Sequence, residues 1–218
     1  MCSSDLIRAP SGGGIHGGPF HSQNPEMWFV RTPGLKVVCP ATAYDAKGLI
    51  KSAIRDNDPI LFFEHKALYR KIKEDLPSEE YTVPIGQAKV VREGRDLSII
   101  TYGAMVWTAL EAAEKLAAEG CSAEVVDLRT LTPLDRDTIC ASVRKTSKAL
   151  LLHEDTRTGG MAGELAATIT ENVFEYLDGP IVRVTAPDTP VPYSPPLEEA
   201  FLPNAQKVVE KARWLYRY

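Results

Sequence analysis

The stretch that decides the fold is residues 97–128, LSIITYGAMVWTALEAAEKLAAEGCSAEVVDL. Its first six residues are an apolar run typical of a strand buried on both faces, and Gly103 follows the run. Apolar residues then recur at spacings of three and four from Val106 to Ala117, which predicts a helix, and Gly120 stands where a C-terminal cap belongs. Residues 123–128 form a second apolar run. Strand, helix and strand in this order predict a parallel crossover unit.

The same alternation continues on both sides of this unit. Upstream we expect a strand over 35–39, a helix over 43–55 and a strand over 60–63. Downstream we expect strands over 149–152 and 181–184, helices over 134–143, 163–176 and 205–216, and an extended crossing over 187–196. This pattern predicts an α/β protein of two units. The C-terminal unit is expected to be whole, whereas the N-terminal unit has only one crossover.

The boundary between the two units is predicted in residues 71–84, which are rich in charge and proline and have no apolar period. We therefore expect a first unit at 1–75, a linker at 76–88 and a second unit at 89–218. Residues 1–70 begin in a loop, and the sequence predicts no strand before it. The first unit is accordingly expected to lack its N-terminal part.

The composition excludes several classes of protein. The 218 residues are 44% hydrophobic and 25% charged, as in ordinary globular chains. A net charge of −4 argues against a dedicated nucleic-acid binder, and no run approaches the ~20 apolar residues that a membrane helix needs. Cys2, Cys39, Cys121 and Cys140 are far apart and are typical of reduced thiols, which favours a cytoplasmic protein over a secreted one.

A glycine-dense loop over residues 11–23 is the most distinctive candidate site. Five of the chain's 15 glycines fall in a stretch of seven residues inside this loop, which indicates tight turns or close approach to another group. The loop carries His16, His21 and Gln23. Because an imidazole titrates near neutral pH, these histidines suit proton transfer or the binding of a substrate anion. The alternative is a surface histidine that is hydrated by water.

Three further clusters could hold ligands, and each has a structural alternative. Residues 153–163 are similar to an anion-binding corner at a helix start, although a helix-packing turn accounts for the same glycines. Asp127 and Arg129 follow a strand and form either a site or an ion pair that pins the loop. Asp56 and Asp58 could bind a cation through oxygen ligands, or they could simply form and cap a turn.

Several longer blocks of the sequence resemble one family. The blocks are Ile7 to Pro10, His21-Ser22-Gln23-Asn24-Pro25-Glu26, Thr32 to Val38, Tyr44 to Leu49, Phe63 to Lys66, Val126 to Asp135, His153-Glu154 and Thr158-Gly159-Gly160. Together they resemble the beta subunit of the thiamin-diphosphate-dependent 2-oxo acid dehydrogenases, over nearly the whole chain from Ile7 on. The histidine that precedes His-Ser-Gln makes the branched-chain (2-oxoisovalerate) type a closer match than the pyruvate type.

The resemblance implies a fold, a reaction and partners. The fold is the C-terminal half of a pyrimidine-binding α/β domain, followed by a three-layer αβα domain like the transketolase C-terminal domain. The reaction is the oxidative decarboxylation of a 2-oxo acid with transfer of the acyl group to a lipoyl group. The implied partners are an alpha subunit, in an α2β2 assembly, and the dihydrolipoyl transacylase core. The implied cofactor is thiamin diphosphate with magnesium, shared with the alpha subunit.

The resemblance also assigns site residues. His21 matches the family's active-site histidine, which helps proton movement in acyl transfer, and His16 and Gln23 lie on the substrate side of the same loop. A potassium-binding turn of some members corresponds to Ala53, Asp56 and Asp58, and an asparagine is usual at the last of these positions. The main cofactor ligands are expected in the alpha subunit and in the missing N-terminal part.

Other functions remain open at this point. Nothing in the sequence matches the family's glutamate that hydrogen-bonds the cofactor ring, so we expect the chain alone to bind the cofactor poorly and to be inactive. A non-catalytic assembly fragment is one alternative, and the basic last helix could then meet an acidic partner. A transketolase-like or deoxyxylulose-phosphate synthase enzyme is another, although it does not account for the block from His21 to Glu26.

Overall fold

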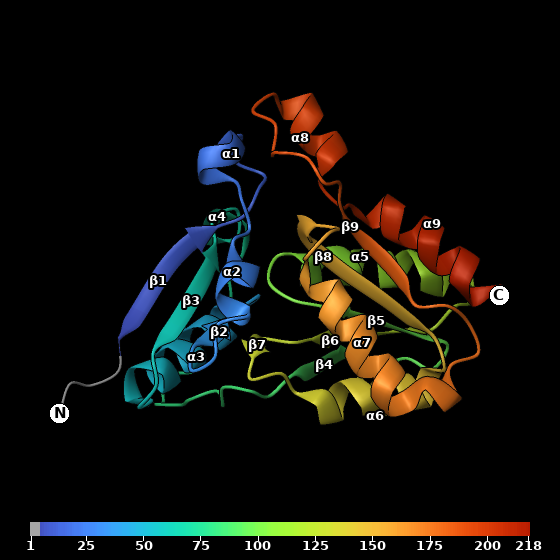
Figure 1. Cartoon of the computed structure of the whole chain (residues 1–218), viewed down its shortest axis with the longest axis horizontal. Coiled ribbons are helices and arrows are strands. Elements are labelled where there is room, and N and C mark those ends of the chain that lie inside the picture. Colours follow the sequence, from blue (N-terminus) through green and yellow to red (C-terminus); the bar gives the residue numbers. More distant parts are fainter. Residues whose placement is uncertain (1–4) are drawn as a thin grey trace.

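The computed structural model describes residues 5–218, which fold around two sheets (Figure 1). The strands are β1 (Leu6–Ser11), β2 (Lys36–Val38), β3 (Ile60–His65), β4 (Lys89–Arg92), β5 (Leu97–Thr101), β6 (Ala123–Asp127), β7 (Thr130–Thr132), β8 (Ala149–Thr156) and β9 (Val182–Ala186). The helices are α1 (Gly18–His21), α2 (Glu26–Val30), α3 (Ala43–Arg55), α4 (Leu68–Lys71), α5 (Met105–Ala118), α6 (Arg136–Thr146), α7 (Met161–Val173), α8 (Pro195–Phe201) and α9 (Ala205–Tyr216), with a 3₁₀ turn at Phe174–Tyr176. The predicted α/β class is confirmed. Within residues 5–218, none of the helices is long and apolar enough to cross a membrane.

The second sheet has the strand order β4-β6-β5-β8-β9 and is the middle layer of a three-layer αβα unit. β5 pairs in parallel with β6, from Leu97 opposite Ala123 to Thr101 opposite Asp127, so the crossover predicted from residues 97–128 is confirmed. Because side chains alternate along a strand, Ile99 packs with α5 and α9 on one face, and Ile100 packs with α6 and α7 on the other.

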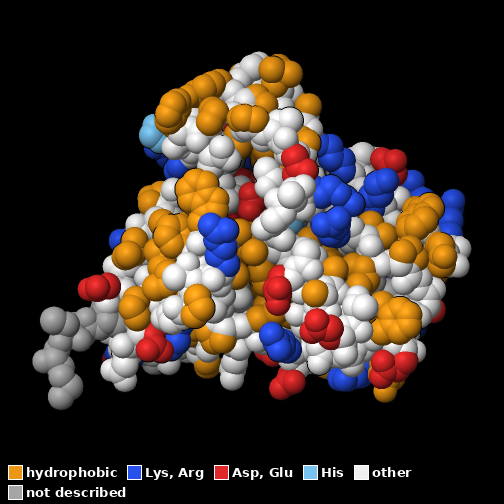
Figure 2. Space-filling model, viewed as in Figure 1, with side chains coloured by type: hydrophobic (Ala, Val, Ile, Leu, Met, Phe, Trp, Pro, Cys, Tyr) orange, Lys and Arg blue, Asp and Glu red, His pale blue; other side chains and the backbone are white. Residues whose placement is uncertain are grey.

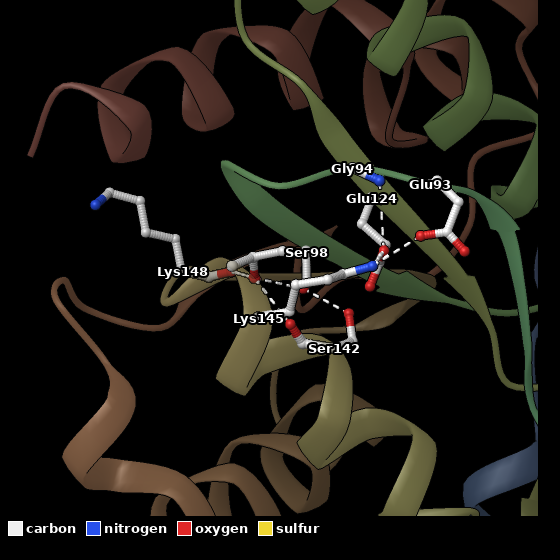
Figure 3. A network of polar contacts seen from close by, with 8 residues as sticks. Glu93, Gly94, Ser98, Glu124, Ser142, Lys145 and Lys148 are labelled. Atoms are coloured by element: carbon white, nitrogen blue, oxygen red, sulfur yellow. Dashed lines mark hydrogen bonds and ion pairs between the residues drawn. The ribbon is translucent and has the colours of Figure 1, made fainter.

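Polar contacts attach α6 to this sheet (Figure 3). The Ser98 hydroxyl on β5 lies 2.6 Å from the Ser142 hydroxyl and 2.7 Å from the Thr146 hydroxyl, and all three side chains are buried. Lys145 adds ion pairs to Glu93 and to the buried Glu124 on β6. Buried hydroxyls that bond to one another carry no desolvation penalty for unmade bonds, so the serines are compatible with an otherwise apolar core.

The first sheet has the order β1-β3-β2-β7 and differs from the prediction at its start. Residues 6–11 form a strand that pairs in parallel with β3, where the sequence predicted only a loop. That expectation was wrong. Pro10 has no N–H to donate, and β1 tolerates it because an edge strand needs pairing groups on one side only. The other end of the sheet is also unexpected, since β7 arrives from the C-terminal unit and pairs antiparallel with β2.

The first sheet packs on both faces. Leu61 and Phe63 of β3 join the core that the second sheet shares with α6 and α7. Ile60 and Phe62 point the other way, toward α3. The shared core fixes the first sheet against the C-terminal unit, so the carboxyl ends of β1 and β3 meet the end of β8.

The segment between α4 and β4 contains no helix or strand, yet it lies closely along α3. Its Val83 is buried, and its Tyr81 ring stacks on Tyr44 at a centroid distance of 4.3 Å. Ser52 of α3 donates to the Val83 carbonyl at 2.6 Å. Gly48 makes this packing possible, because an added Cβ would lie 2.4 Å from Val83 Cγ2.

Candidate functional site

The glycine loop connects β1 to α2 and projects beside α8, at the carboxyl ends of β1 and β3 (Figure 1). The Gly12 N–H donates to the Gln23 carbonyl at 3.1 Å and closes the base of the loop. Its tip holds the one-turn helix α1, and the His21 side chain at the end of that turn is exposed. Lys66 donates to the His21 carbonyl, which ties the turn to the end of β3. The loop therefore presents an imidazole to solvent on a braced backbone.

The base of the loop is bonded to a carboxylate of the other unit. Glu154, near the end of β8, is buried, and its Oε1 accepts the Gly13 N–H at 2.5 Å and the Asn24 side-chain amide at 3.0 Å. Its Oε2 lies 2.9 Å from His65 Nε2. Burial opposes ionisation, but the His65 ring and the donors Asn24 and Gly13 outweigh it and hold the pKa of Glu154 below its usual value. A carboxylate at this point binds both ends of the loop.

Gly12 is required for this arrangement. Its φ is +88°, a left-handed conformation that favours glycine, and an added Cβ would lie 2.1 Å from His65 Nε2. Any side chain at position 12 would displace the His65 ring from Glu154. The glycine density of the sequence thus serves a close approach between the loop and β3.

The tip of the loop is bonded to a second carboxylate. Glu198 of α8 is buried, and its Oε2 lies 2.7 Å from His16 Nδ1 and accepts the His16 N–H at 3.1 Å. His16 has a φ of +57°, which is uncommon for a non-glycine residue. Tyr193 covers Gly18, where an added Cβ would lie 2.5 Å from its ring. Gln23 and His16 are exposed, on the same loop as His21.

Hydrophobic side chains gather over the lobe that α1 and α8 form (Figure 2). Phe20 is 82% exposed, and Tyr193 and Leu197 are also largely exposed. Phe20, the residue before His21, is therefore part of an exposed apolar surface on this lobe.

A buried acidic cluster lies behind the loop. The Tyr102 hydroxyl donates to Glu26 Oε1 at 3.0 Å. Burial, with the nearby Asp155 charge, raises the pKa of Glu26 to about 8, and burial raises the pKa of Asp155 to about 6. Burial also lowers the pKa of His153 to about 4. Near pH 7 Glu26 and His153 are therefore mainly neutral, whereas Asp155 is mostly ionised, and this reduces charge repulsion within the cluster.

The segment 153–163 favours its packing alternative over an anion-binding corner. The His153 ring is buried beneath Gly160, the residue before α7, and an added Cβ there would lie 2.5 Å from His153 Cε1. Glu154 points to the glycine loop. Gly160 thus makes room for a ring, and no ligand is needed to explain it.

The pair at Asp127 and Arg129 has a different geometry from the predicted ion pair. Asp127 Oδ1 accepts the Arg129 backbone N–H at 2.9 Å, and the Arg129 guanidinium pairs with Asp45 at 2.5 Å. Burial raises the pKa of Asp127 to about 7, so its carboxyl is a poor partner for a cation. The ion pair joins the turn between β6 and β7 to α3 and serves structure.

The predicted potassium turn contains a cation from the chain itself. Lys36 Nζ lies 2.7 Å from Asp56 Oδ2 and 3.0 Å from Asp58 Oδ2. The Asp56 N–H points to the Ala53 carbonyl at 3.4 Å. With the carboxylates turned to Lys36, a potassium ion here would need main-chain oxygens. Within residues 5–218 no group of three or more His, Cys, Asp or Glu side chains is arranged to hold a metal ion.

Comparisons with known proteins agree with this architecture. The family model "Transketolase, C-terminal domain" matches residues 86–208, and "Transketolase, pyrimidine binding domain" matches residues 3–71. The chain belongs to the transketolase C-terminal domain family, with a pyrimidine-binding unit before that domain. Within this class it is similar to the beta subunits of 2-oxo acid dehydrogenases, so the resemblance found in the sequence is confirmed.

Two relatives from Bacillus subtilis (strain 168) illustrate the match. The 2-oxoisovalerate dehydrogenase subunit beta is 51% identical over 98% of this chain and 65% of its own length. The pyruvate dehydrogenase E1 component subunit beta is 52% identical over 95% of this chain and 63% of its own length. The chain thus spans slightly under two thirds of these relatives, and the identities do not separate the two types.

A solved structure supports the fold. The "Split gene transketolase, inactive beta4 tetramer" superposes with a TM-score of 0.79 and 27% identity over 97% of this chain and 66% of the other. Transketolase from Pichia stipitis, at 16% identity and a TM-score of 0.66, shares the fold alone.

The described carboxylates around the glycine loop do not fit the ring-binding part of the thiamin diphosphate site that the family implies. His21 is exposed and accessible on the loop. The carboxylates near it are already engaged, because Glu64 is bonded by Arg8 and Tyr69, and Glu154 and Glu198 point into the loop backbone. Glu198 Oε1 has no partner among the described residues, but it is buried, so none of the three presents an accessible oxygen to the ring of the cofactor.

Sequence reasoning missed three contributors to this site: His65, Asn24 and Glu198. Their partners lie far along the chain, so no local pattern marks them. Asn24 and His65 stand in the blocks that carry the family resemblance, but that resemblance assigns them no role. Glu198 follows the proline-rich segment and has no such signal.

Proposed function

We propose that this chain acts as the beta part of the decarboxylase component of a 2-oxo acid dehydrogenase, where it supplies the loop histidine His21. The observation that supports this most is the exposed imidazole on a glycine loop that two buried carboxylates hold. A proton donor and acceptor on a lobe with exposed apolar side chains suits acyl transfer to the thiol of a lipoyl arm. Thiamin diphosphate supplies the decarboxylation chemistry in this family.

The proposal includes partners. An alpha subunit, in an α2β2 assembly, would contribute cofactor-binding residues and share thiamin diphosphate and magnesium, and the dihydrolipoyl transacylase core would receive the acyl group. The exposed apolar lobe around Phe20 is consistent with burial against another subunit. Cytoplasmic location and potassium at the turn of Ala53, Asp56 and Asp58 stay predictions.

For the substrate we propose a branched-chain 2-oxo acid, with pyruvate as the alternative. The support is His16, the histidine that precedes His-Ser-Gln on the substrate side of the loop. Turnover of 2-oxoisovalerate and pyruvate by the assembled complex would separate the two, because a difference in kcat/KM reports which side chain the pocket accommodates.

We further propose that the chain alone does not turn over substrate. The second candidate function, a non-catalytic assembly fragment, is favoured by the engaged carboxylates beside the loop. Co-expression with an alpha subunit separates the two candidates. Assembly with acylation of a lipoyl domain supports the catalytic role, and assembly without acylation supports the fragment. Decarboxylation by the purified chain alone would contradict the proposal.

A further inference from the structure

We propose that Glu154 and Glu198 are positioning residues, a pair of buried carboxylates in the C-terminal unit that hold the glycine loop and thereby place His21. This inference rests on the proposed role of His21. Glu154 binds the base of the loop and Glu198 binds its tip. We call this arrangement the carboxylate clamp.

At the base, one side chain bonds both ends of the loop. Glu154 Oε1 accepts from Gly13, at the start of the loop, and from Asn24, just after its end. Its other oxygen faces His65 on β3. The contact therefore fixes the separation of the loop ends and joins them to the sheet, at the point where β1 and β3 terminate.

At the tip, one oxygen of Glu198 receives both the backbone N–H and the ring nitrogen of His16. His16 holds a left-handed backbone conformation, which is unfavourable for a side chain with a Cβ and needs support from its surroundings. Glu198 Oε1 is buried without a partner among the described residues, so the loop provides the hydrogen bonds that this carboxylate has. The loop backbone then leads directly through Gly17 into the turn that carries His21.

Because both carboxylates are buried, the position of the loop and the hydrogen bonding of the carboxylates depend on each other. Glu154 and Glu198 are 6% and 1% exposed, so water cannot replace the loop donors without rearrangement of the interface. A buried charge that loses its hydrogen bonds carries a large desolvation cost. Opening the loop is therefore coupled to exposing these side chains, and the C-terminal unit controls where His21 lies.

Limited chymotrypsin digestion of the full chain tests the clamp without any partner. Phe20 in the loop is 82% exposed, and Phe174 in the C-terminal unit is 66% exposed and serves as an internal reference. Glu198→Gln and Glu154→Gln keep the side-chain shape and remove the charge. We expect each to raise the cleavage rate at Phe20 about tenfold, since hydrogen bonds to charged groups are the stronger ones. Cleavage at Phe174 should not change.

Glu199→Gln is the matched control, because Glu199 is the exposed neighbour of Glu198 on α8. It should leave both rates at the wild-type value. Unchanged cleavage at Phe20 in both clamp variants would overturn the proposal. An equal rise at Phe20 and Phe174 would also overturn it, since that would indicate general loosening of the fold.

A second readout joins the clamp to catalysis. In a complex with an alpha subunit, we expect Glu198→Gln to lower kcat for lipoyl-domain acylation about tenfold with KM for the lipoyl domain unchanged, because a misplaced group loses rate and not binding. Loss of binding with unchanged kcat would contradict a positioning role. If the wild-type complex shows no acylation, the proposed function fails, while the proteolysis result still decides whether the clamp holds the loop.

Discussion

Glu26 is a buried carboxyl beside Tyr102. It is surrounded by core residues and other acidic side chains, and not by water as a carboxylate at the surface would be. Its pKa of about 8 lies far above the usual value of 4.5. Between these values the folded chain holds a proton that the unfolded chain has released, so the free energy of unfolding falls as pH rises. Asp127, with a pKa of about 7, and Asp155, at about 6, act in the same direction.

We therefore expect the stability of the chain to fall between pH 5 and pH 8. The slope approaches about 1.4 kcal/mol per pH unit for each proton involved. His153, whose pKa is lowered from 6.5 to about 4, offsets one of these protons in the acidic part of the range. Glu26→Gln keeps an acceptor for the Tyr102 hydroxyl and cannot ionise, so it should make the fall shallower. Urea unfolding at a series of pH values measures this. The exposed Glu171→Gln is the control, and equal slopes in wild type and Glu26→Gln would contradict the assignment.

At the residue scale the sequence identifies the loop but not what holds it. The spacing of glycines and histidines marks His16, His21 and Gln23, and the structure places them together on the loop. From sequence, Glu154 belongs to an anion corner. Its true partners, Gly13, Asn24 and His65, come from the other unit, and no local periodicity reports a contact between distant segments.

Elements with a strong period were predicted well. Helix α3 spans Ala43–Arg55, as its apolar spacing indicated, and the Thr42 side chain caps it by accepting the Asp45 N–H. Strand β1 was missed because it contains Arg8 and Pro10 and shows little alternation of apolar and polar residues. Strands β4 and β7 were also missed, because at four and three residues they are too short to show a period.

The contact between α3 and the following linker gives a prediction at this scale. Glycine to alanine inside a helix normally gains about 1 kcal/mol. At Gly48 the new Cβ would press on Val83 at 2.4 Å, and overpacking of this kind costs about 1–3 kcal/mol. We expect Gly48→Ala to lower the free energy of unfolding, as measured by urea denaturation.

Gly163→Ala in α7 is the matched control, because nothing lies within 4 Å of its added Cβ. It should raise stability by up to about 1 kcal/mol. Stabilisation by Gly48→Ala to a similar extent would show that Val83 does not pack as described.

At the scale of the whole molecule, the first sheet has an edge strand, β1, that no second described strand covers. Among the described strands β1 pairs only with β3, and its Ile7 side chain is 51% exposed. A cleft of about 400 Å³ lies beside it, lined by Arg8, Phe62 and Ile50 among others. An edge strand with unpaired backbone groups and apolar side chains favours association with other chains.

We expect the purified chain to self-associate as its concentration rises. Ile7→Lys should reduce this association, since a charge on an edge strand disfavours pairing with another edge. Ile54→Lys is the control, because Ile54 is 63% exposed on α3 and belongs to no strand. Sedimentation velocity measures the outcome. An equal effect of the two substitutions would indicate general charge repulsion and not edge pairing.

The whole-molecule architecture followed from the strand–helix alternation and from the resemblance. What the sequence could not reveal was the docking of the units, in which β7 joins the first sheet and one core is shared between both. Such docking depends on which faces remain apolar after each unit folds, and it is set by three-dimensional packing.

The role of His21 is tested most directly by the acylation of a lipoyl domain by an alpha-subunit complex that carries His21→Ala. We predict that the complex assembles and reduces an artificial electron acceptor in the presence of a 2-oxo acid, while acylation of the lipoyl domain falls about 100-fold or more, as expected for the loss of a general acid–base group. Acylation at the wild-type rate by the His21→Ala complex would show that this imidazole has no part in the reaction.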